Sequence, residues 1–278
     1  LSLSVVLKSN GTIEKKVVGS VVEALVADQS VPEDFSRLFE IFESPSLQIA
    51  SFTITEKGYS LHDGKGDILP VVEAGFREST ENQGHLMGRI AALCYRRYQT
   101  CKAPIALSSM DNCSHNGDKL KAGVMAFVEA WTKNGIVEKE FEDFMKEPSK
   151  VSFPCSMIDK ITPRPDENVK KMLEEDGFED TELIITSRNT YTSPFVNSEE
   201  TGYLVIEDSF PNGRPPLEKA GVLFTDKETV DKVERMKVCT CLNPLHTALA
   251  VYGCLLSHTS IHEEMKDAEL SSLIEKIF

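Results

Sequence analysis

The chain lacks the long apolar run and the excess of positive charge that mark two large classes of protein. Within its 278 residues, no uninterrupted apolar run reaches the roughly 18 residues of a membrane-spanning helix. No signal-peptide pattern opens the chain. Its 44 acidic residues outnumber its 30 basic ones, giving a net charge of −14. This balance argues against a nucleic acid or a membrane surface as partner, so we expect neither.

Cysteine is present without the spacing of a disulfide framework. The seven cysteines are odd in number, and Cys239-Thr-Cys241 is too short for a metal-binding CxxC pair. The pattern is typical of a reduced, globular protein with buried thiols. We therefore expect a cytoplasmic protein.

A complete glycine-rich dinucleotide fingerprint is also missing. Gly64-Lys-Gly66 has no third glycine and lies in a polar loop, where such residues usually form a turn. No Gly-x-Ser-x-Gly elbow of a serine hydrolase is present. The chain begins with Leu, and Leu1–Leu7 already has the pattern of a strand inside a domain. We expect that the true beginning of the protein lies upstream.

What is present is an alternation of short apolar strands and amphipathic helices. This alternation predicts an α/β fold with a Rossmann-like, mostly parallel sheet, whose ligands lie outside the carboxyl ends of the strands. We expect strands at Val5–Leu7, Ile49–Thr55, Ile105–Ser108, Leu183–Thr186 and Tyr203–Ile206, and helices at Phe35–Glu43, Leu86–Tyr98 and Leu120–Thr132.

The pattern changes to continuous helical periodicity from about Asp226. The loop Pro211–Pro216 contains three prolines and a glycine, which prevent regular structure and favour a boundary nearby. We predict a cofactor-binding α/β domain at 1–225, incomplete at its start, and the beginning of a helical domain at 226–278.

The segment after the strand Ile105–Ser108 is the first candidate for chemistry. The amide of Asn112 could donate a hydrogen bond to a developing alkoxide. The alternative is structural, since Asp111, Asn112 and Ser114 are all residue types that cap helices and form turns. We read Asn116-Gly117 as a turn, with a helix beginning near Asp118.

The stretch from Lys237 to His246 places an amine, the Asn243 amide and an imidazole within ten residues. Such a set suits the deprotonation of a sugar hydroxyl and the stabilisation of the oxygen. Lys237 lies among apolar neighbours, whose burial would lower the pKa of an amine. The alternatives are a solvated lysine, and a helix that simply starts at Asn243-Pro244 with a structural histidine in its first turn.

Metal sites are poorly supported. His258 and His262 lie at i and i+4, followed by Glu263 and Glu264, but no third ligand with convincing spacing accompanies them. We therefore expect chemistry without a metal, and a zinc hydrolase is only a remote alternative.

Read together, several segments resemble the polyol and uronate dehydrogenase family, which includes mannitol 2-dehydrogenases, fructuronate reductases (D-mannonate oxidoreductases) and tagaturonate reductases. The matching segments occur in family order across nearly the whole chain. They are Ser51–Tyr59, Asp111-Asn112 with Asn116-Gly117, Phe153–Pro163, Ile206–Pro216 and Lys237–His246.

The resemblance implies a metal-independent oxidoreductase that uses NAD or NADP on an open-chain sugar derivative. It assigns Lys237 as the base, Asn112 and Asn243 as an oxyanion hole, and His246 as the group that orients the substrate oxygen. It also places Asp159 and Glu56 near the substrate, and Thr55 and Asn112 near the cofactor. The identity of the cofactor and the oligomeric state stay open.

The chain departs from the family pattern at the lysine, which stands six residues before the asparagine instead of five. On a regular helix, six residues would turn Lys237 by roughly 240° from Asn243. Pro244 removes one helical hydrogen bond and can enforce a bulge that absorbs the extra residue. We therefore predict irregular helix at 239–244, as a requirement for Lys237 to be the base.

Lys57 and Lys160 flank the implied substrate motifs, and a carboxylate would bind such cations. The form of Thr55–Tyr59 also resembles the uronate enzymes. We therefore expect fructuronate and mannonate as substrates, with mannitol/fructose or tagaturonate as alternatives. Both lysines could instead be plain surface charges. A shortened, inactive family member that only binds a ligand is the non-enzymatic alternative.

Overall fold

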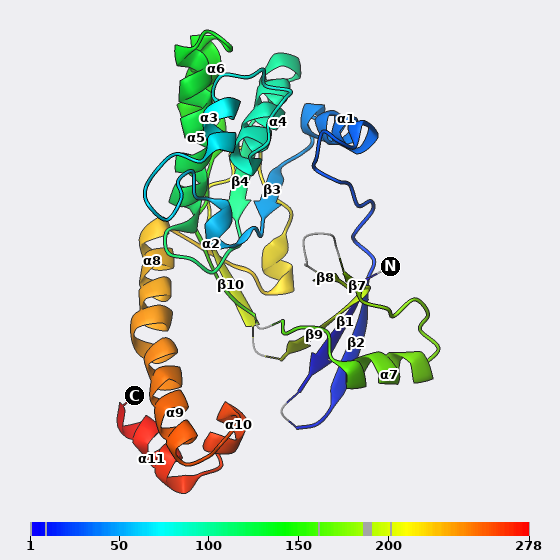
Figure 1. Cartoon of the computed structure of the whole chain (residues 1–278), viewed down its shortest axis with the longest axis vertical. Coiled ribbons are helices and arrows are strands. Elements are labelled where there is room, and N and C mark those ends of the chain that lie inside the picture. Colours follow the sequence, from blue (N-terminus) through cyan, green and yellow to red (C-terminus); the bar gives the residue numbers. More distant parts are fainter. Residues whose placement is uncertain (1, 9, 161, 186–190, 201, 278) are drawn as a thin grey trace.

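The structure is a computed structural model that describes residues 2–8, 10–160, 162–185, 191–200 and 202–277. A body of helices around short strands forms one end of the molecule (Figure 1). A small sheet with its own helix lies below this body in the view of Figure 1, and a long helix runs away from the body toward the C-terminus.

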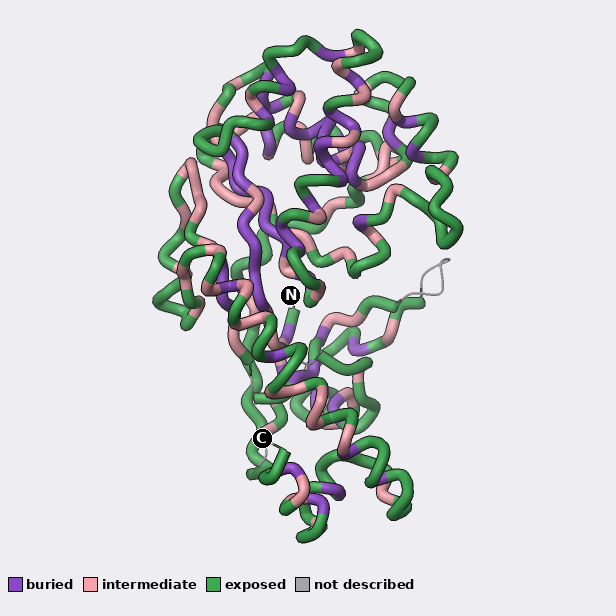
Figure 2. The backbone as a smooth tube through the Cα atoms, turned by 90° about the vertical axis from the view of Figure 1, so that its left-hand side faces the viewer, coloured by how far each residue is buried: buried purple, intermediate pink, exposed green. Residues whose placement is uncertain are grey.

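The centre of the body is a parallel sheet of three strands in the order β3 (Ile49–Phe52), β4 (Ile105–Ser109) and β5 (Val151–Ser152). Every residue of β4 is buried, as expected for a strand covered on both faces. The surrounding helices, which supply most of the buried apolar side chains, are α1 (Pro32–Glu43), α3 (Pro70–Gly75), α4 (Leu86–Thr100), α5 (Asn116–Lys133) and α6 (Lys139–Lys146). Figure 2 shows the buried backbone concentrated in this body.

A second sheet connects the body to the long helix. Its strands are β6 (Ser156–Lys160), β10 (Gly202–Glu207), antiparallel to β6, and β11 (Leu223–Thr225), parallel to β10. Met157 and Val205 of this sheet pack with Val230 of α8 (Lys227–Met236) in a small core of their own. This contact fixes the start of the long helix beside the carboxyl end of β4.

The third sheet lies at the N-terminus. Strand β1 (Ser2–Leu7) pairs with β2 (Ile13–Val18) antiparallel and with β9 (Phe195–Glu199) parallel. Helix α7 (Glu167–Glu175) packs on it. The remaining elements are short: α2 (Thr55–Gly58), the hairpin β7 (Ile184–Ile185) with β8 (Tyr191–Thr192), and a 3₁₀ turn at Leu217–Ala220.

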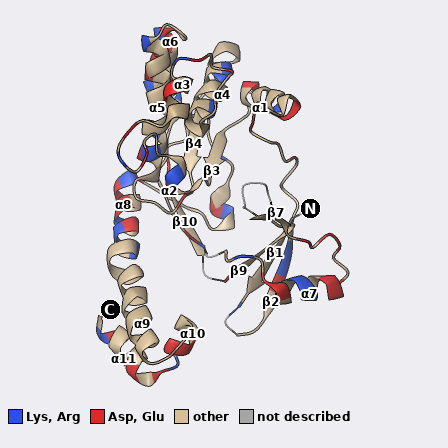
Figure 3. Ribbon diagram, viewed as in Figure 1, with Lys and Arg blue, Asp and Glu red and all other residues tan. Residues whose placement is uncertain are grey.

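The long helix is α8, a π-helical turn at Lys237–Cys241 and α9 (Asn243–Leu255), followed by α10 (Ile261–Glu264) and α11 (Ala268–Ile277). Leu249 packs against Leu270 and Ile274 of α11. The span Lys227–Leu255 is long and apolar enough to cross a membrane by length and composition alone, and α9 carries no Lys, Arg, Asp or Glu (Figure 3). One such helix is weak evidence for a membrane protein, and the expectation of no membrane stays a prediction.

The predicted fold class, an α/β Rossmann-like architecture with parallel strands, is confirmed, although the strands form several small sheets instead of one. The expected strand at 49–55 ends at Phe52, and Thr55 begins a helix. The predicted turn at Asn116-Gly117 is wrong, because both residues are buried in the first turn of α5. The division at 225 stays a prediction.

No element expected from the sequence corresponds to β2, β5, β6, β8, β9, β11, α3, α6 or α7. Leu1, Ile161 and Thr186, which belong to segments singled out in the sequence, lie outside the described residues.

Candidate active site

The carboxyl end of β4 is anchored to the segment after β3 by a buried carboxylate. Asp111 accepts hydrogen bonds from the main-chain N–H groups of Ile54 and Thr55, each at 2.8 Å, and from the hydroxyl of Tyr59. Burial, and then the bond to Asp111, raise the pKa of the Tyr59 hydroxyl, which stays neutral as the donor. Asp111 therefore holds the two strand ends together and leaves the next residue, Asn112, exposed at the edge of the sheet.

The short helix α2 starts with Thr55 in the left-handed region, at φ 64°, which is unusual for a β-branched residue. The next side chain, Glu56, receives a hydrogen bond at 2.5 Å from Lys119 of α5. This bond raises the pKa of the Lys119 ammonium. Thr55, Glu56 and Lys57 are all exposed, and of these only Glu56 lines the cavity described below.

The helix that carries the lysine is irregular, as predicted, over residues that overlap the expected stretch 239–244. The N–H of Leu242 donates to the carbonyl of Lys237 at 3.0 Å, an i to i+5 bond that closes a π turn. Leu242 then leaves helical geometry, with φ −120° and ψ −66°, and α9 begins at Asn243. Pro244 explains the break because it has no N–H to donate to Thr240. The irregularity begins two residues earlier than expected, at Lys237 itself.

Lys237 is buried, with only 6% of its surface exposed. Its ammonium lies 3.0 Å from an Asp159 carboxylate oxygen and donates to the carbonyl of Ile158 at 3.0 Å, both on β6. A buried ammonium needs such partners to offset its lost hydration. Since an ammonium has three N–H donors, one stays available to a ligand. Burial, and then the Asp159 charge, raise the pKa of nearby Tyr203.

A cavity of about 420 Å³ lies between α8, the loop after β4 and α2. It brings together four of the predicted site residues, Glu56, Asn112, Lys237 and Asn243, from segments distant in the sequence. The other residues that line it are Cys113, Ser114, His115, Asp231, Glu234, Arg235, Val238 and Cys239.

The other predicted residues lie outside this lining. Asp159 reaches the site only through Lys237. His246 is exposed in the first turn of α9, and its main-chain N–H donates to the carbonyl of Leu242. Lys160 lines a different cavity, where its ammonium donates to the carbonyl of Glu199. Lys57 is exposed on α2.

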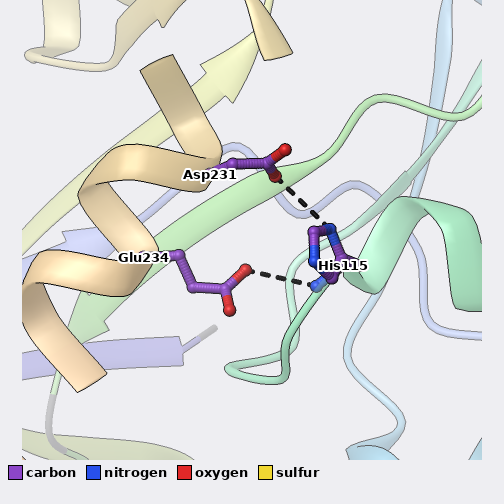
Figure 4. A group of neighbouring side chains, drawn as sticks. All are labelled: His115, Asp231 and Glu234. Atoms are coloured by element: carbon purple, nitrogen blue, oxygen red, sulfur yellow. Dashed lines mark hydrogen bonds and ion pairs between the residues drawn. The ribbon is translucent and has the colours of Figure 1, made fainter. Parts of the chain in front are cut away.

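A histidine and two carboxylates that sequence reasoning did not connect meet at one wall of the cavity (Figure 4). The imidazole Nδ1 of His115 lies 3.4 Å from Asp231, and the His115 main-chain N–H donates to Glu234 at 3.2 Å. One ligand atom from each side chain lies within 4.8 Å of the others, the composition of a divalent-cation site. Ser114 also donates to Glu234. These contacts already bind α8 to the start of α5.

Two comparisons with known proteins bear on these observations. The sequence profile of the Mannitol dehydrogenase Rossmann domain matches residues 1–219. The chain belongs to this family. A D-mannonate oxidoreductase of Thermotoga maritima is 51% identical over 279 residues, covering all of this chain and 51% of the relative. A mannitol 2-dehydrogenase of Phaeosphaeria nodorum is 30% identical over 94% of the chain and 42% of the relative.

Two solved structures of sugar-alcohol dehydrogenases have a similar fold. A mannitol 2-dehydrogenase of Pseudomonas fluorescens in a ternary complex with NAD and D-mannitol superposes with a TM-score of 0.73 at 29% identity, over 99% of this chain and 51% of that one. A substrate-free D-sorbitol dehydrogenase gives a TM-score of 0.80 at 25% identity, over 98% and 51%. The chain spans about half the length of the relatives it matches. The resemblance inferred from the motifs is confirmed.

Sequence reasoning about this mannitol dehydrogenase family member missed the structural anchors of the site. Asn116 is fully buried: its amide donates to the carbonyls of Asp111 at 2.9 Å and Ser156 at 3.0 Å, and its oxygen accepts from Ser156 N–H. It therefore joins β4 to β6, the strand that holds Lys237. The adjacent Gly117 allows this joint, since a Cβ there would lie 2.5 Å from the Phe153 carbonyl oxygen. The glycine that follows Asn116 was the sequence signal that could have indicated this close packing.

Proposed function

We propose that the protein is an NAD(P)-dependent secondary-alcohol dehydrogenase that interconverts D-mannonate and D-fructuronate. The 51% identical D-mannonate oxidoreductase supports this choice of substrate. The observation that carries the proposal is the buried Lys237, held by Asp159 and lining one cavity with two amide side chains, Asn112 and Asn243.

The proposed chemistry follows from the donors around that cavity. In the oxidation of the alcohol, the Lys237 amine takes the hydroxyl proton; in the reduction, its ammonium returns the proton to the oxygen. The amides of Asn112 and Asn243 donate to the oxygen as negative charge develops on it. His246 orients the same oxygen once the substrate lies against α9. Asp159 positions the Lys237 ammonium and offsets its charge in the resting state.

A nicotinamide cofactor fits at the carboxyl ends of β3 and β4. These parallel strands end at Phe52 and Ser109, and the exposed Thr55 and Asn112 follow them at the edge where such sheets bind ligands. Thr55 and Asn112 would hold the nicotinamide end of the cofactor, which supplies or accepts the hydride when bound. Asn112 would thus contact both cofactor and substrate.

The wider assignments are part of the same proposal. We propose a cofactor-binding domain at 1–225 and the start of a helical substrate domain at 226–278, without a catalytic metal. We also propose a cytoplasmic location, with neither nucleic acid nor membrane as partner. The charge of −14 and the cysteines, all free in the described residues, support that location.

The test is the oxidation of NADH and NADPH by the purified protein in the presence of fructuronate, tagaturonate and fructose, together with its intact mass. We expect the highest kcat/KM with fructuronate. Faster turnover of tagaturonate or fructose would replace the substrate assignment. A protein that binds neither cofactor and turns over none of the three would refute the enzymatic function and leave the non-enzymatic alternative.

A further inference from the structure

The cavity at the candidate active site has a cation that the proposed chemistry does not use. Two of its lining residues carry positive charge, Lys237 and Arg235. Lys237 is engaged by Asp159 and the Ile158 carbonyl. Arg235 is exposed, and its guanidinium forms no ion pair or hydrogen bond with the residues described in the structure.

The acidic residues of the same cavity have other partners. Glu56 is paired with Lys119, and Glu234 accepts hydrogen bonds from Ser114 and from the main chain of His115. The remaining acid, Asp231, lies one turn before Arg235 on α8, yet its near neighbour is the His115 imidazole at 3.4 Å. Arg235 therefore lines the cavity without a partner among the described residues, and the five N–H donors of its guanidinium are available to a ligand.

Arg235 and Lys237 line the same cavity. Arg235 belongs to the last turn of α8, and Lys237 is the first residue of the π-helical turn that follows. A sugar acid bound in this cavity would bring its carbonyl to Lys237 and its carboxylate to Arg235.

We propose that Arg235 binds the carboxylate of the substrate and so determines the preference for a sugar acid over a neutral polyol. This inference rests on the proposed function and adds the residue that recognises the carboxylate of the substrate. The guanidinium fork matches a carboxylate in two parallel hydrogen bonds, which a neutral hydroxymethyl group cannot reproduce. Arg235 takes this role in place of Lys57 and Lys160, which lie outside the cavity.

The experiment compares Arg235→Gln and Arg235→Lys with wild type, using fructuronate and fructose as paired substrates. We expect Arg235→Gln to lower kcat/KM for fructuronate by about 10- to 100-fold, the loss of a charge-assisted hydrogen-bonded partner. Fructose turnover should change by less than about threefold, because the neutral substrate does not use the guanidinium. The kcat/KM of Arg235→Lys for fructuronate should lie between those of wild type and Arg235→Gln, since lysine keeps the charge and loses the two parallel donors of the guanidinium.

The matched control is Lys232→Gln, which removes one positive charge from the same helix. Lys232 is exposed, paired with Glu228 at 2.8 Å, and absent from the cavity lining. Lys232→Gln should leave kcat/KM for both substrates unchanged. The inference is wrong if Arg235→Gln leaves kcat/KM for fructuronate unchanged or lowers kcat/KM equally for both substrates. It is also wrong if Lys232→Gln has the same effect as Arg235→Gln.

Calorimetric binding of mannonate and mannitol separates this inference from the proposed reaction. Wild type should bind mannonate more tightly than mannitol, and Arg235→Gln should remove the difference. A wild type that shows this pattern without turnover would refute the proposed reaction and keep the carboxylate site. A wild type that turns over fructuronate while Arg235→Gln binds mannonate normally would refute the site alone, and a wild type that binds neither ligand would refute it as well.

Discussion

Replacing Asp111 by Asn should destabilise the protein more than the loss of one surface charge would. The carboxylate accepts three hydrogen bonds, from Ile54 N–H, Thr55 N–H and the Tyr59 hydroxyl, and it is 7% exposed. An Asn has a single acceptor oxygen and would turn its NH₂ group toward at least one of these donors. Losing one or two charge-assisted bonds of about 1.5–3 kcal/mol each gives an expected destabilisation of about 3 kcal/mol.

The assay is urea unfolding followed by circular dichroism, with Asp63→Asn as the control. Asp63 also accepts two main-chain N–H groups, from Lys65 at 2.8 Å and Asp67 at 3.0 Å, but in an exposed turn. Its replacement should cost less than about 1 kcal/mol, since water takes over the donors. Equal losses for the two variants would refute the conclusion that Asp111 anchors the site.

Two further predictions concern packing and pH. Gly117→Ala should destabilise the protein by about 1–3 kcal/mol, because the new Cβ meets the Phe153 main-chain oxygen. The control is Gly64→Ala, where an added Cβ meets no atom within 4 Å, so its stability should be close to that of wild type. Equal urea midpoints for the two variants would contradict the close approach at Gly117. Glu142→Gln should cost about 1 kcal/mol at neutral pH, because the hydrogen bond from Lys146 lowers the pKa of Glu142 to about 2. Because folding lowers that pKa, the stability difference between Glu142→Gln and wild type should be complete above pH 4.5 and should vanish as the pH falls through about 2. A difference in thermal midpoint that stays constant across this pH range would refute the ion pair.

The sequence predicted the elements whose patterns are local and strong. β4 is a short apolar run, and α4 and α5 carry clear helical periodicity, so the local pattern of apolar residues identified them. The irregular helix was predicted from the family resemblance, against which one extra residue stands between Lys237 and Asn243, and from the proline at 244. The order of the motifs was sufficient to identify the family, because the five matching segments follow one another along the chain as they do in family members.

The parts that the sequence did not predict depend on contacts between distant residues. The parallel pairing of β1 with β9 joins residues near 5 to residues near 197, and no local pattern records it. Asp111 and Asn116 have the composition of ordinary caps and turns, and only the fold shows that both are buried and bonded to neighbouring strands. Lys160 was assigned to the substrate from its position in a motif, whereas in the structure it lines another cavity and its ammonium donates to the carbonyl of Glu199.

The central proposal is that Lys237 transfers the proton, and Lys237→Met tests it most directly. The variant keeps much of the side-chain volume and removes the amine, and the rate of fructuronate-dependent NADH oxidation is measured with NADH binding as the check on folding. We expect kcat to fall by about 10²- to 10⁴-fold while NADH binding is retained. A kcat within about threefold of wild type would contradict the assignment and require another proton donor.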